Sequence, residues 1–335
     1  MQTAPFSLIT IDDHAAIESA LNQIGLWEPG ETLEDVQRAG DGNMNSVLRV
    51  TTSQRHVILK QSRPWVEKYP QIAAPADRIF AEIDFYRRVA PHEELARSMP
   101  KLLAASDKLY LMAMEDLGQA SDYCDLYQSR DVASMPLPEA TQWLSQLHRI
   151  PLDPNEAGRV GCHELRELNH QHMFVIPLQT PSAVPLDDVC AGLEGLAAVV
   201  RSNQLFHQIA SSLGERYLGT GPCLLHGDFY PGSWLSTGDG MRVIDPEFCF
   251  AGPAEFDLGV LAGHRVLVGG GEESVDVVLR HYSESGGGDI DAGLVSRFAA
   301  LEVIRRLIGV AQLPLSATLE QRENMIQVAT ALIEA

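Results

Sequence analysis

Hydrophobic residues change their spacing along the chain, from a short helical pattern to a β-type pattern and then to long helical patterns. Ile17, Leu21 and Ile24 recur at helical intervals and predict a leading helix over about residues 11–24. From residue 34, three strands of an antiparallel sheet are predicted by the short β-type runs VQRA, SVLRV and HVILKQ. One amphipathic helix is then predicted by PADRIFAEIDFYRRV, and two more strands by PKLLAASDKLYLMAMEDLG.

Beyond residue 118 the pattern is mostly helical. The predicted helices are PEATQWLSQLHRI, LDDVCAGLEGLAAVVRSNQLFHQIASSLGERY, ESVDVVLRHYSES, DAGLVSRFAALEVIRRLIGVAQL and LEQRENMIQVATALIEA. A β-like island from CLLHGDFYPGSWL to MRVIDPEF interrupts them, with two apolar strands joined by a turn at Asp239-Gly240. We therefore predict an α+β fold with two lobes: residues 1–117 form a small antiparallel β lobe with one main helix, and residues 118–335 form a larger, mostly helical lobe.

Composition narrows the class of partner. The 45 acidic and 25 basic residues give a net charge of -20, which repels nucleic acids and anionic membranes. The five cysteines are odd in number, widely spaced and in no CxxC motif, which argues against a disulfide framework or a zinc site: Cys124, Cys162, Cys190, Cys223 and Cys249. The sequence shows no signal peptide and no run long enough to span a membrane, so we expect a cytoplasmic protein.

Carboxylates follow the two apolar strands of the β-like island. Asp228 lies in the sequence HGD after one strand, and Asp245 and Glu247 lie in DPE after another. Phosphoryl transfer needs such a set, because one carboxylate orients the attacking hydroxyl and others hold the magnesium that bridges the nucleotide phosphates. We therefore predict that Asp228 serves the hydroxyl and that Asp245 binds metal.

Groups suited to a nucleotide occur earlier in the chain. A glycine-rich loop brings backbone N–H groups close to phosphates, here through Gly40, Asp41, Gly42 and Asn43. Lys60 on the third strand can reach the α- and β-phosphates of ATP, and Glu82 in the next helix can hold Lys60 extended. Backbone groups for the adenine edge come from MAMEDLG, at Met114, Glu115 and Leu117.

Each part also has a purely structural interpretation. A lone glycine-rich loop also forms hairpin turns, and Lys60 and Glu82 are residue types that usually lie at the surface. His226 is better explained as a buried brace of its loop than as a catalyst, and Asp257 as a helix cap or loop brace than as a metal ligand. The structural interpretation weakens only when all the parts are taken together.

Arg305 and Arg306 lie on an otherwise apolar predicted helix, LEVIRRLIGVAQL. Consecutive helical residues point about a quarter-turn apart, so at most one can face fully away from the core. Both side chains either extend to solvent or pair with Glu302, or they reach the active site and stabilise charge on the transferred phosphoryl group. We favour the catalytic interpretation.

The combined pattern resembles the aminoglycoside phosphotransferase and choline kinase superfamily, whose signature is HGD with an asparagine five positions after the aspartate, then a second Asp motif. LLHGDFYPGSWL and RVIDPEFCFAGPAEFDLG match it, with Ser233 at the asparagine position. Ser233, DPEF, GDGNMN, VILKQ and the paired arginines are together similar to the methylthioribose kinase branch. The resemblance extends from about residue 40 to residue 309, although FYP and AEF replace the usual LHT and MGF.

The resemblance implies a protein-kinase-like fold and a kinase that uses ATP and Mg²⁺. Asp228 would be the catalytic carboxylate, Lys60 the phosphate-binding lysine, and Asp245 and Glu247 metal ligands. A serine hydroxyl is a poorer magnesium ligand than an amide oxygen, so at Ser233 a second carboxylate from Glu247 would compensate.

The implied acceptor is a small hydroxylated metabolite, first of all 5-methylthioribose in methionine salvage. A kinase of another small alcohol, such as an aminoglycoside, choline, homoserine or an unassigned metabolite, is the alternative, and the net charge of -20 keeps a cationic acceptor open. An inactive nucleotide-binding regulator is a third interpretation, although such a protein would be expected to lack at least one of Lys60, Asp228, Asp245 and Glu247. The resembled branch commonly forms homodimers, which implies a homodimer here.

Overall fold

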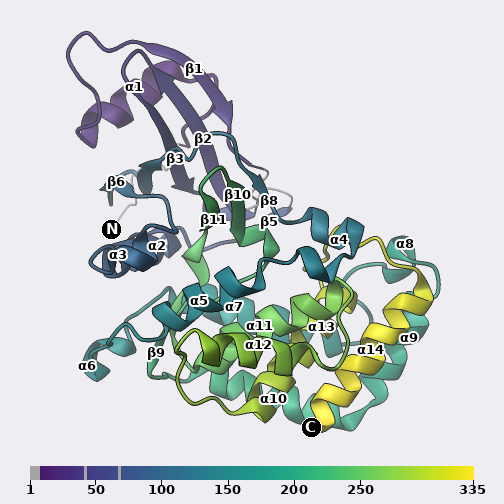
Figure 1. Ribbon diagram of the computed structural model, residues 1–335. Helices are drawn as coiled ribbons and strands as arrows, with labels where there is room; N and C mark the ends of the chain where they lie inside the picture. The colour runs from purple at the N-terminus through teal and green to yellow at the C-terminus, as the bar shows by residue number, and fades with distance from the viewer. Residues whose placement is uncertain (1–7, 41–43, 67–68) are drawn as a thin grey trace. The chain divides into compact units, whose positions relative to one another are not determined.

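A computed structural model describes residues 8–40, 44–66 and 69–335, which divide into two compact units, Met1–Ala120 and Ser121–Ala335 (Figure 1). The hydrophobic pattern predicts a boundary after residue 117. Gly118 stays with the first unit because its carbonyl accepts a hydrogen bond of 2.7 Å from Arg49 Nη2. The β-rich first unit and the helical second unit confirm the predicted fold class.

The first unit is built on an antiparallel sheet with the strand order β1-β2-β3-β7-β6. Its elements are α1 (His14–Gln23), β1 (Leu33–Arg38), β2 (Asn45–Thr52), β3 (His56–Ser62), β4 (Trp65–Val66), β5 (Tyr69–Ala73), α2 (Arg78–Val89), α3 (Glu93–Ala96), β6 (Leu102–Ser106) and β7 (Leu111–Glu115). The α1 helix packs on the sheet because Ile17 and Leu21 form one apolar face, which is buried with Leu48, Val50 and Leu59.

The second unit is mostly helical. Its elements are β8 (Ser121–Asp122), α4 (Asp125–Ser129), η1 (Val132–Ser134), α5 (Leu137–Leu147), α6 (Pro154–Ala157), α7 (His163–His170), η2 (Gln171–Val175), η3 (Ile176–Leu178), α8 (Leu186–Val189), α9 (Leu193–Ser202), α10 (Gln204–Leu218), β9 (Cys223–Leu225), η4 (Pro231–Ser233), β10 (Trp234–Thr237), β11 (Gly240–Val243), η5 (Pro246–Phe248), β12 (Phe250–Gly252), α11 (Ala254–Leu267), α12 (Ser274–Glu284), α13 (Ala292–Ile308) and α14 (Leu319–Glu334). None of the helices in the described ranges is both long and apolar enough to cross a membrane.

The core of the second unit is organised around the packing of α11 on α13 (Figure 1). Two glycines one helical turn apart on α11 allow the close approach. A Cβ atom on Gly259 would lie 2.4 Å from Phe298 Cβ, and one on Gly263 would lie 2.9 Å from the Ala299 carbonyl oxygen and 3.1 Å from Glu302 Cβ. This contact brings the polar side chains of both helices together.

The structure of this unit differs from the prediction in three places. The α11 helix was not predicted, because it is buried nearly all round and therefore shows no polar face to set a period. The strand before Asp228 does not belong to the hairpin at Asp239-Gly240, which joins β10 to β11. That strand is β9, and it pairs with β12, which follows the DPE segment. The long pattern over residues 186–217 also divides into α8, α9 and α10, since Asn203 caps a new helix.

Candidate active site

Lys60 and Glu82 form a buried ion pair within the first unit. Lys60 Nζ lies 2.7 Å from each carboxylate oxygen of Glu82, and the two residues are 1% and 0% exposed. The strand β3 supplies the lysine and α2 the glutamate, as the sequence predicts. An ammonium group without its carboxylate would be costly to bury here, so the pair holds Lys60 in one extended position. The surface interpretation of both residues is wrong.

The start of α2 is tied to the end of the glycine-rich loop by a buried arginine. Arg78 is fully buried and donates hydrogen bonds to the carbonyl of Arg63 at 2.9 Å, to Asn45 Oδ1 at 3.0 Å and to the carbonyl of Met44. Gly40 begins the loop with φ +87°, a conformation that favours glycine. The remaining predicted loop residues, Asp41, Gly42 and Asn43, lie outside the described residues. No sequence motif pointed to Arg78.

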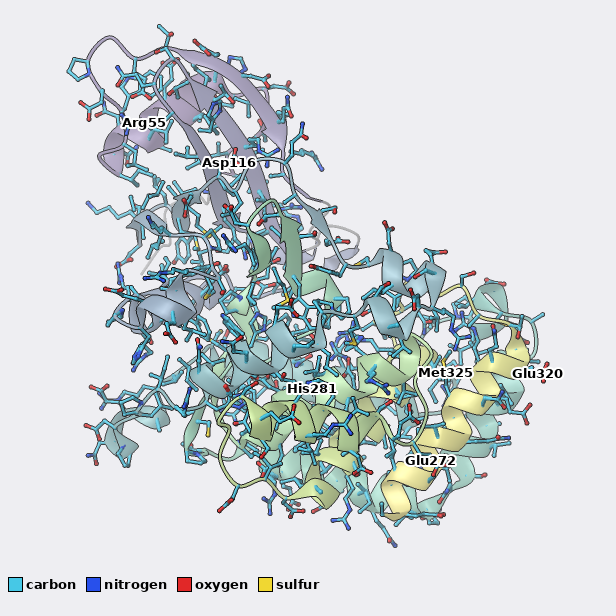
Figure 2. All side chains as sticks on the ribbon, in the orientation of Figure 1. Arg55, Asp116, Glu272, His281, Glu320 and Met325 are labelled. Carbon is cyan, nitrogen blue, oxygen red and sulfur yellow. The ribbon has the colours of Figure 1, made fainter. Side chains whose placement is uncertain are left out.

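The predicted adenine-binding segment continues from β7. Met114 is buried, and the backbone N–H of Glu115 donates to the carbonyl of Lys101 at 2.9 Å, so that N–H is already used. Leu117 lies past the strand, and its backbone N–H has no hydrogen-bond partner within the described part of the chain. Asp116, labelled in Figure 2, anchors the segment through an ion pair of 2.9 Å with Arg49 Nε. Leu117 is thus the member of the predicted set whose N–H is available to a base.

In the second unit, the loop after β9 is braced from below by Asp257 in the first turn of α11. Its carboxylate accepts hydrogen bonds from the backbone N–H groups of His226 at 2.8 Å and Gly227 at 3.0 Å. Gly227 has φ +86°, and a Cβ atom there would lie 2.0 Å from the Phe248 carbonyl oxygen, so only glycine fits. These contacts agree with the bracing interpretation of Asp257 and leave Asp228 at the tip of the loop.

His226 and Ser233 also serve the loop. His226 is fully buried, its Nε2 lies 2.9 Å from the carbonyl oxygen of Ile244, and burial lowers its pKa. The ring is therefore neutral and donates to that carbonyl, which links the loop to the strand β11. Ser233 Oγ donates to the carbonyl oxygen of Asp228 at 3.0 Å. Sequence reasoning predicted the brace at His226, and the serine adds a second one.

The predicted metal ligands lie after β11. Asp245 is exposed and adopts a left-handed conformation, with φ 60°, at the start of η5. Glu247, in the same short turn, is 7% exposed, and Ser233 is 3% exposed. Among the described residues, no group of three or more histidine, cysteine or acidic side chains is arranged so that it could hold a metal ion. A pair of carboxylates still fits magnesium, which proteins commonly hold through one or two carboxylates together with substrate phosphates.

Arg305 and Arg306 turn inward to Asp228. Arg306 Nη2 donates to Asp228 Oδ1 at 3.0 Å, and Arg305 Nη1 lies 3.6 Å from the same oxygen. Both arginines also pair with Glu302, at 3.0 Å from Arg305 Nη1 and 2.6 Å from Arg306 Nε. The arginines are 5% and 6% exposed, so the alternative in which they extend to solvent is wrong, whereas pairing with Glu302 and contact with Asp228 occur together.

The charges around the arginines nearly balance. Burial opposes ionisation of Glu302, but Arg305 and Arg306 hold the pKa of this carboxyl well below its usual range. Burial also opposes the charge on Arg306, yet Glu302 and Asp228 raise the pKa of its guanidinium. Two cations thus face two carboxylates. Arg305 Nε is buried and has no hydrogen-bond partner among the residues that the structure describes, whereas Arg306 uses its Nε and Nη2 atoms for Glu302 and Asp228.

Sequence reasoning missed two residues that lie behind this cluster. His264 on α11 contacts Glu302, and Tyr127 on α4 contacts His264. Neither belongs to a motif, and Tyr127 is distant in sequence from both α11 and α13. The only available signal was that His264 lies in a mostly apolar run, GVLAGHRVL.

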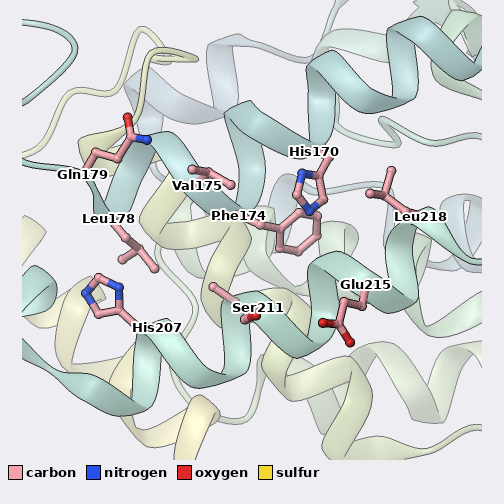
Figure 3. Close-up of a pocket in the computed structure, with 10 residues that line it drawn as sticks. His170, Phe174, Val175, Leu178, Gln179, His207, Ser211, Glu215 and Leu218 are labelled. Atoms are coloured by element: carbon pink, nitrogen blue, oxygen red, sulfur yellow. The ribbon is translucent and has the colours of Figure 1, made fainter.

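A separate pocket of about 440 Å³ opens between η2 and α10 (Figure 3). Phe174 and Leu178 contribute apolar surface, and His170, His207 and Glu215 contribute polar groups. It contains none of the residues predicted to bind nucleotide, metal or acceptor. We therefore place the candidate active site at Asp228 and not in this pocket.

Comparisons with known proteins agree with the resemblance seen in the sequence. A model described as the phosphotransferase enzyme family matches residues 35–293. The methylthioribose kinase of Citrobacter koseri is 27% identical over 270 residues, which are 75% of this chain and 64% of that protein. The chain thus spans less than two thirds of the length of this curated relative.

Solved structures show the same fold at low sequence identity. Spectinomycin phosphotransferase APH(9)-Ia, in complex with ADP and spectinomycin, has a TM-score of 0.55 and 12% identity over 96% of this chain and 98% of that chain. LicA, a choline kinase from Streptococcus pneumoniae, in complex with AMP, has a TM-score of 0.53 and 14% identity over 96% and 97%.

Proposed function

Because this chain belongs to the phosphotransferase enzyme family, we propose that it transfers the γ-phosphate of ATP, with Mg²⁺, to a hydroxyl group of a small metabolite. The observation that carries the proposal is the convergence of Arg305 and Arg306 on Asp228. A carboxylate positions the attacking hydroxyl, and adjacent guanidinium groups stabilise the charge that spreads over the phosphoryl oxygens in the transition state.

Each group has a distinct task in this proposal. Asp228 accepts a hydrogen bond from the acceptor hydroxyl and takes up its proton as the bond to phosphorus forms. The guanidinium groups of Arg305 and Arg306 bind the transferred group. Lys60, held by Glu82, binds the α- and β-phosphates of ATP. These roles require orientation of the reactants, and the protein forms no covalent intermediate.

Further groups would bind the nucleotide and the metal. Gly40 and the loop after it supply backbone N–H groups to the phosphates, and Leu117 supplies an N–H to adenine. Asp245 and Glu247 would hold magnesium, which would neutralise charge on the nucleotide phosphates. Ser233 keeps its lone pairs for a third, weaker contact, since its proton is donated to a carbonyl.

We propose 5-methylthioribose, or a similar sugar, as the acceptor. Support comes from the similarity to methylthioribose kinases and from the arginine pair, because two guanidinium groups beside Asp228 disfavour a polycationic aminoglycoside. A cationic acceptor is the second candidate, since the net charge of -20 would attract it. The product would be a phosphorylated sugar for methionine salvage in the first case.

A coupled assay of ADP release tests the proposal. Purified protein with ATP and Mg²⁺ is given methylthioribose, choline, homoserine or an aminoglycoside, and the Asp228→Asn variant is the matched control. We expect ADP release that depends on methylthioribose and falls roughly 100-fold or more in the variant. Release with choline or an aminoglycoside instead would overturn the acceptor assignment. ATP binding without acceptor-dependent release of ADP would favour the third interpretation, an inactive nucleotide-binding regulator.

A further inference from the structure

A buried chain of hydrogen bonds leads from the arginine pair into the core of the second unit. His264 Nε2 lies 3.0 Å from Glu302 Oε1, and His264 Nδ1 lies 2.7 Å from the hydroxyl of Tyr127. Tyr127, His264 and Glu302 are each fully buried. The three residues come from α4, α11 and α13, so the chain joins three elements of the fold behind the candidate active site.

The hydrogen-bonding partners determine where the protons lie. The Glu302 carboxylate can only accept hydrogen bonds, so the Nε2 atom of His264 must carry a proton. Burial lowers the pKa of His264, which keeps its imidazole neutral. Nδ1 then has a lone pair and accepts a hydrogen bond from the hydroxyl group of Tyr127. One tautomer therefore satisfies every partner, and the orientation of the ring is fixed from both ends.

Glu302 transmits this orientation to the arginines. Its Oε1 atom accepts both from His264 Nε2 and from Arg306 Nε, while its Oε2 atom accepts from Arg305. The Arg306 guanidinium also lies over the ring of Tyr230, 4.7 Å from the centroid, and that ring is 5.2 Å from the ring of His264. His264 therefore contacts two of the groups that hold Arg306 against Asp228.

We propose that His264, oriented by Tyr127, is a positioning residue for phosphoryl transfer, which through Glu302 holds Arg306 in register with Asp228. This inference rests on the proposed function. A protein in which well-packed apolar side chains replace a buried polar network is often no less stable. A contribution to stability therefore does not explain why Tyr127, His264 and Glu302 form this chain of hydrogen bonds. The hydrogen bonds end at the arginines that contact Asp228, and this position explains them, because a small displacement of a catalytic group greatly reduces the reaction rate.

Two substitutions at His264 separate positioning from packing. The amide nitrogen of His264→Gln lies about where Nε2 lies and can still donate to Glu302, whereas the shorter His264→Asn reaches only toward Tyr127. Both variants remove the ring, so each serves as the stability control of the other. We expect His264→Gln to keep turnover near that of the wild type. His264→Asn should lose roughly 10–100-fold in kcat, with the KM for ATP nearly unchanged. Equal losses in kcat for the two variants would overturn the proposal.

A double-variant cycle tests whether the effect passes through the arginine. In the Arg306→Met background, His264→Asn should cost little further turnover, because the group that it positions is already gone. If the double variant instead shows the product of the two single-variant losses in kcat, the proposal is overturned. Urea unfolding midpoints of the same four proteins form a second cycle that needs no turnover. If the wild type is inactive with every acceptor, the proposed function fails. The unfolding cycle then decides the positioning, and strictly additive shifts would refute it.

Discussion

Replacement of Arg306 by methionine is the most informative single perturbation of the candidate active site. Methionine keeps much of the apolar stem and removes the guanidinium, which has lost most of its contact with water in the folded protein. Two charged hydrogen bonds disappear, from Nε to Glu302 at 2.6 Å and from Nη2 to Asp228 at 3.0 Å. The cost in stability then depends on whether the carboxylates of Glu302 and Asp228 still have a cationic partner.

The expected loss of stability depends on the ion-pair partners that remain after the substitution. Breaking a buried ion pair typically costs about 3–5 kcal/mol, because it leaves an uncompensated charge. Glu302 keeps Arg305 at 3.0 Å, and Asp228 keeps the same arginine at 3.6 Å. We therefore expect the low end, about 3 kcal/mol. If the second unit, Ser121–Ala335, unfolds cooperatively, this loss corresponds to a fall in Tm of roughly 6–12 °C.

Turnover should fall roughly 100-fold or more, because Arg306 would stabilise charge on the phosphoryl group mainly in the transition state. ATP affinity should hardly change. Arg305→Met is the matched control: it leaves Arg306 on both carboxylates, so its activity loss should be smaller. Differential scanning calorimetry, ATP titration and the ADP-release assay on both variants measure these quantities. Wild-type turnover and an unchanged Tm in Arg306→Met would refute both the catalytic role and the buried ion-pair reasoning.

Three further predictions concern the carboxylates and the buried histidines. Asp228→Asn should keep its fold and ATP binding, seen by circular dichroism and calorimetry, while turnover drops roughly 100-fold or more; near-normal turnover would remove its assigned role. Asp245→Ala should abolish magnesium-dependent nucleotide binding, and Glu247→Gln should raise the magnesium requirement, so an unchanged magnesium titration would contradict the ligand assignment. Burial lowers the pKa of His226 and His264, so below pH 6.5 the unfolded chain binds protons that the folded chain does not. Stability should therefore fall as the pH decreases below 7, and His264→Gln should make the free energy of unfolding less dependent on pH in urea unfolding.

The local pattern of the sequence determined the parts of this protein that have a local cause. The strands of the first sheet and α1 follow from side-chain spacing, because a residue's neighbours along the chain decide which face it joins. The pairing of Lys60 with Glu82 was predictable because a strand and the helix after it place both in a known kinase order. The loop at Asp228 was predictable from HGD, whose glycine must adopt φ +86° beneath the Phe248 carbonyl.

Tertiary structure alone decided the features that depend on elements distant in sequence. The α11 helix was not predictable by period because it is buried nearly all round, and the pairing of β9 with β12 was missed because the nearer hairpin partner looked stronger. The direction of Arg305 and Arg306 was open, since two adjacent helical residues can turn inward only if buried carboxylates meet them. Those carboxylates come from Asp228 and Glu302, and the close packing at Gly263 brings His264 to Glu302. The sequence alone therefore cannot identify the ion-pair partner of a charged residue on an apolar helix, because that partner is determined only when the helices pack.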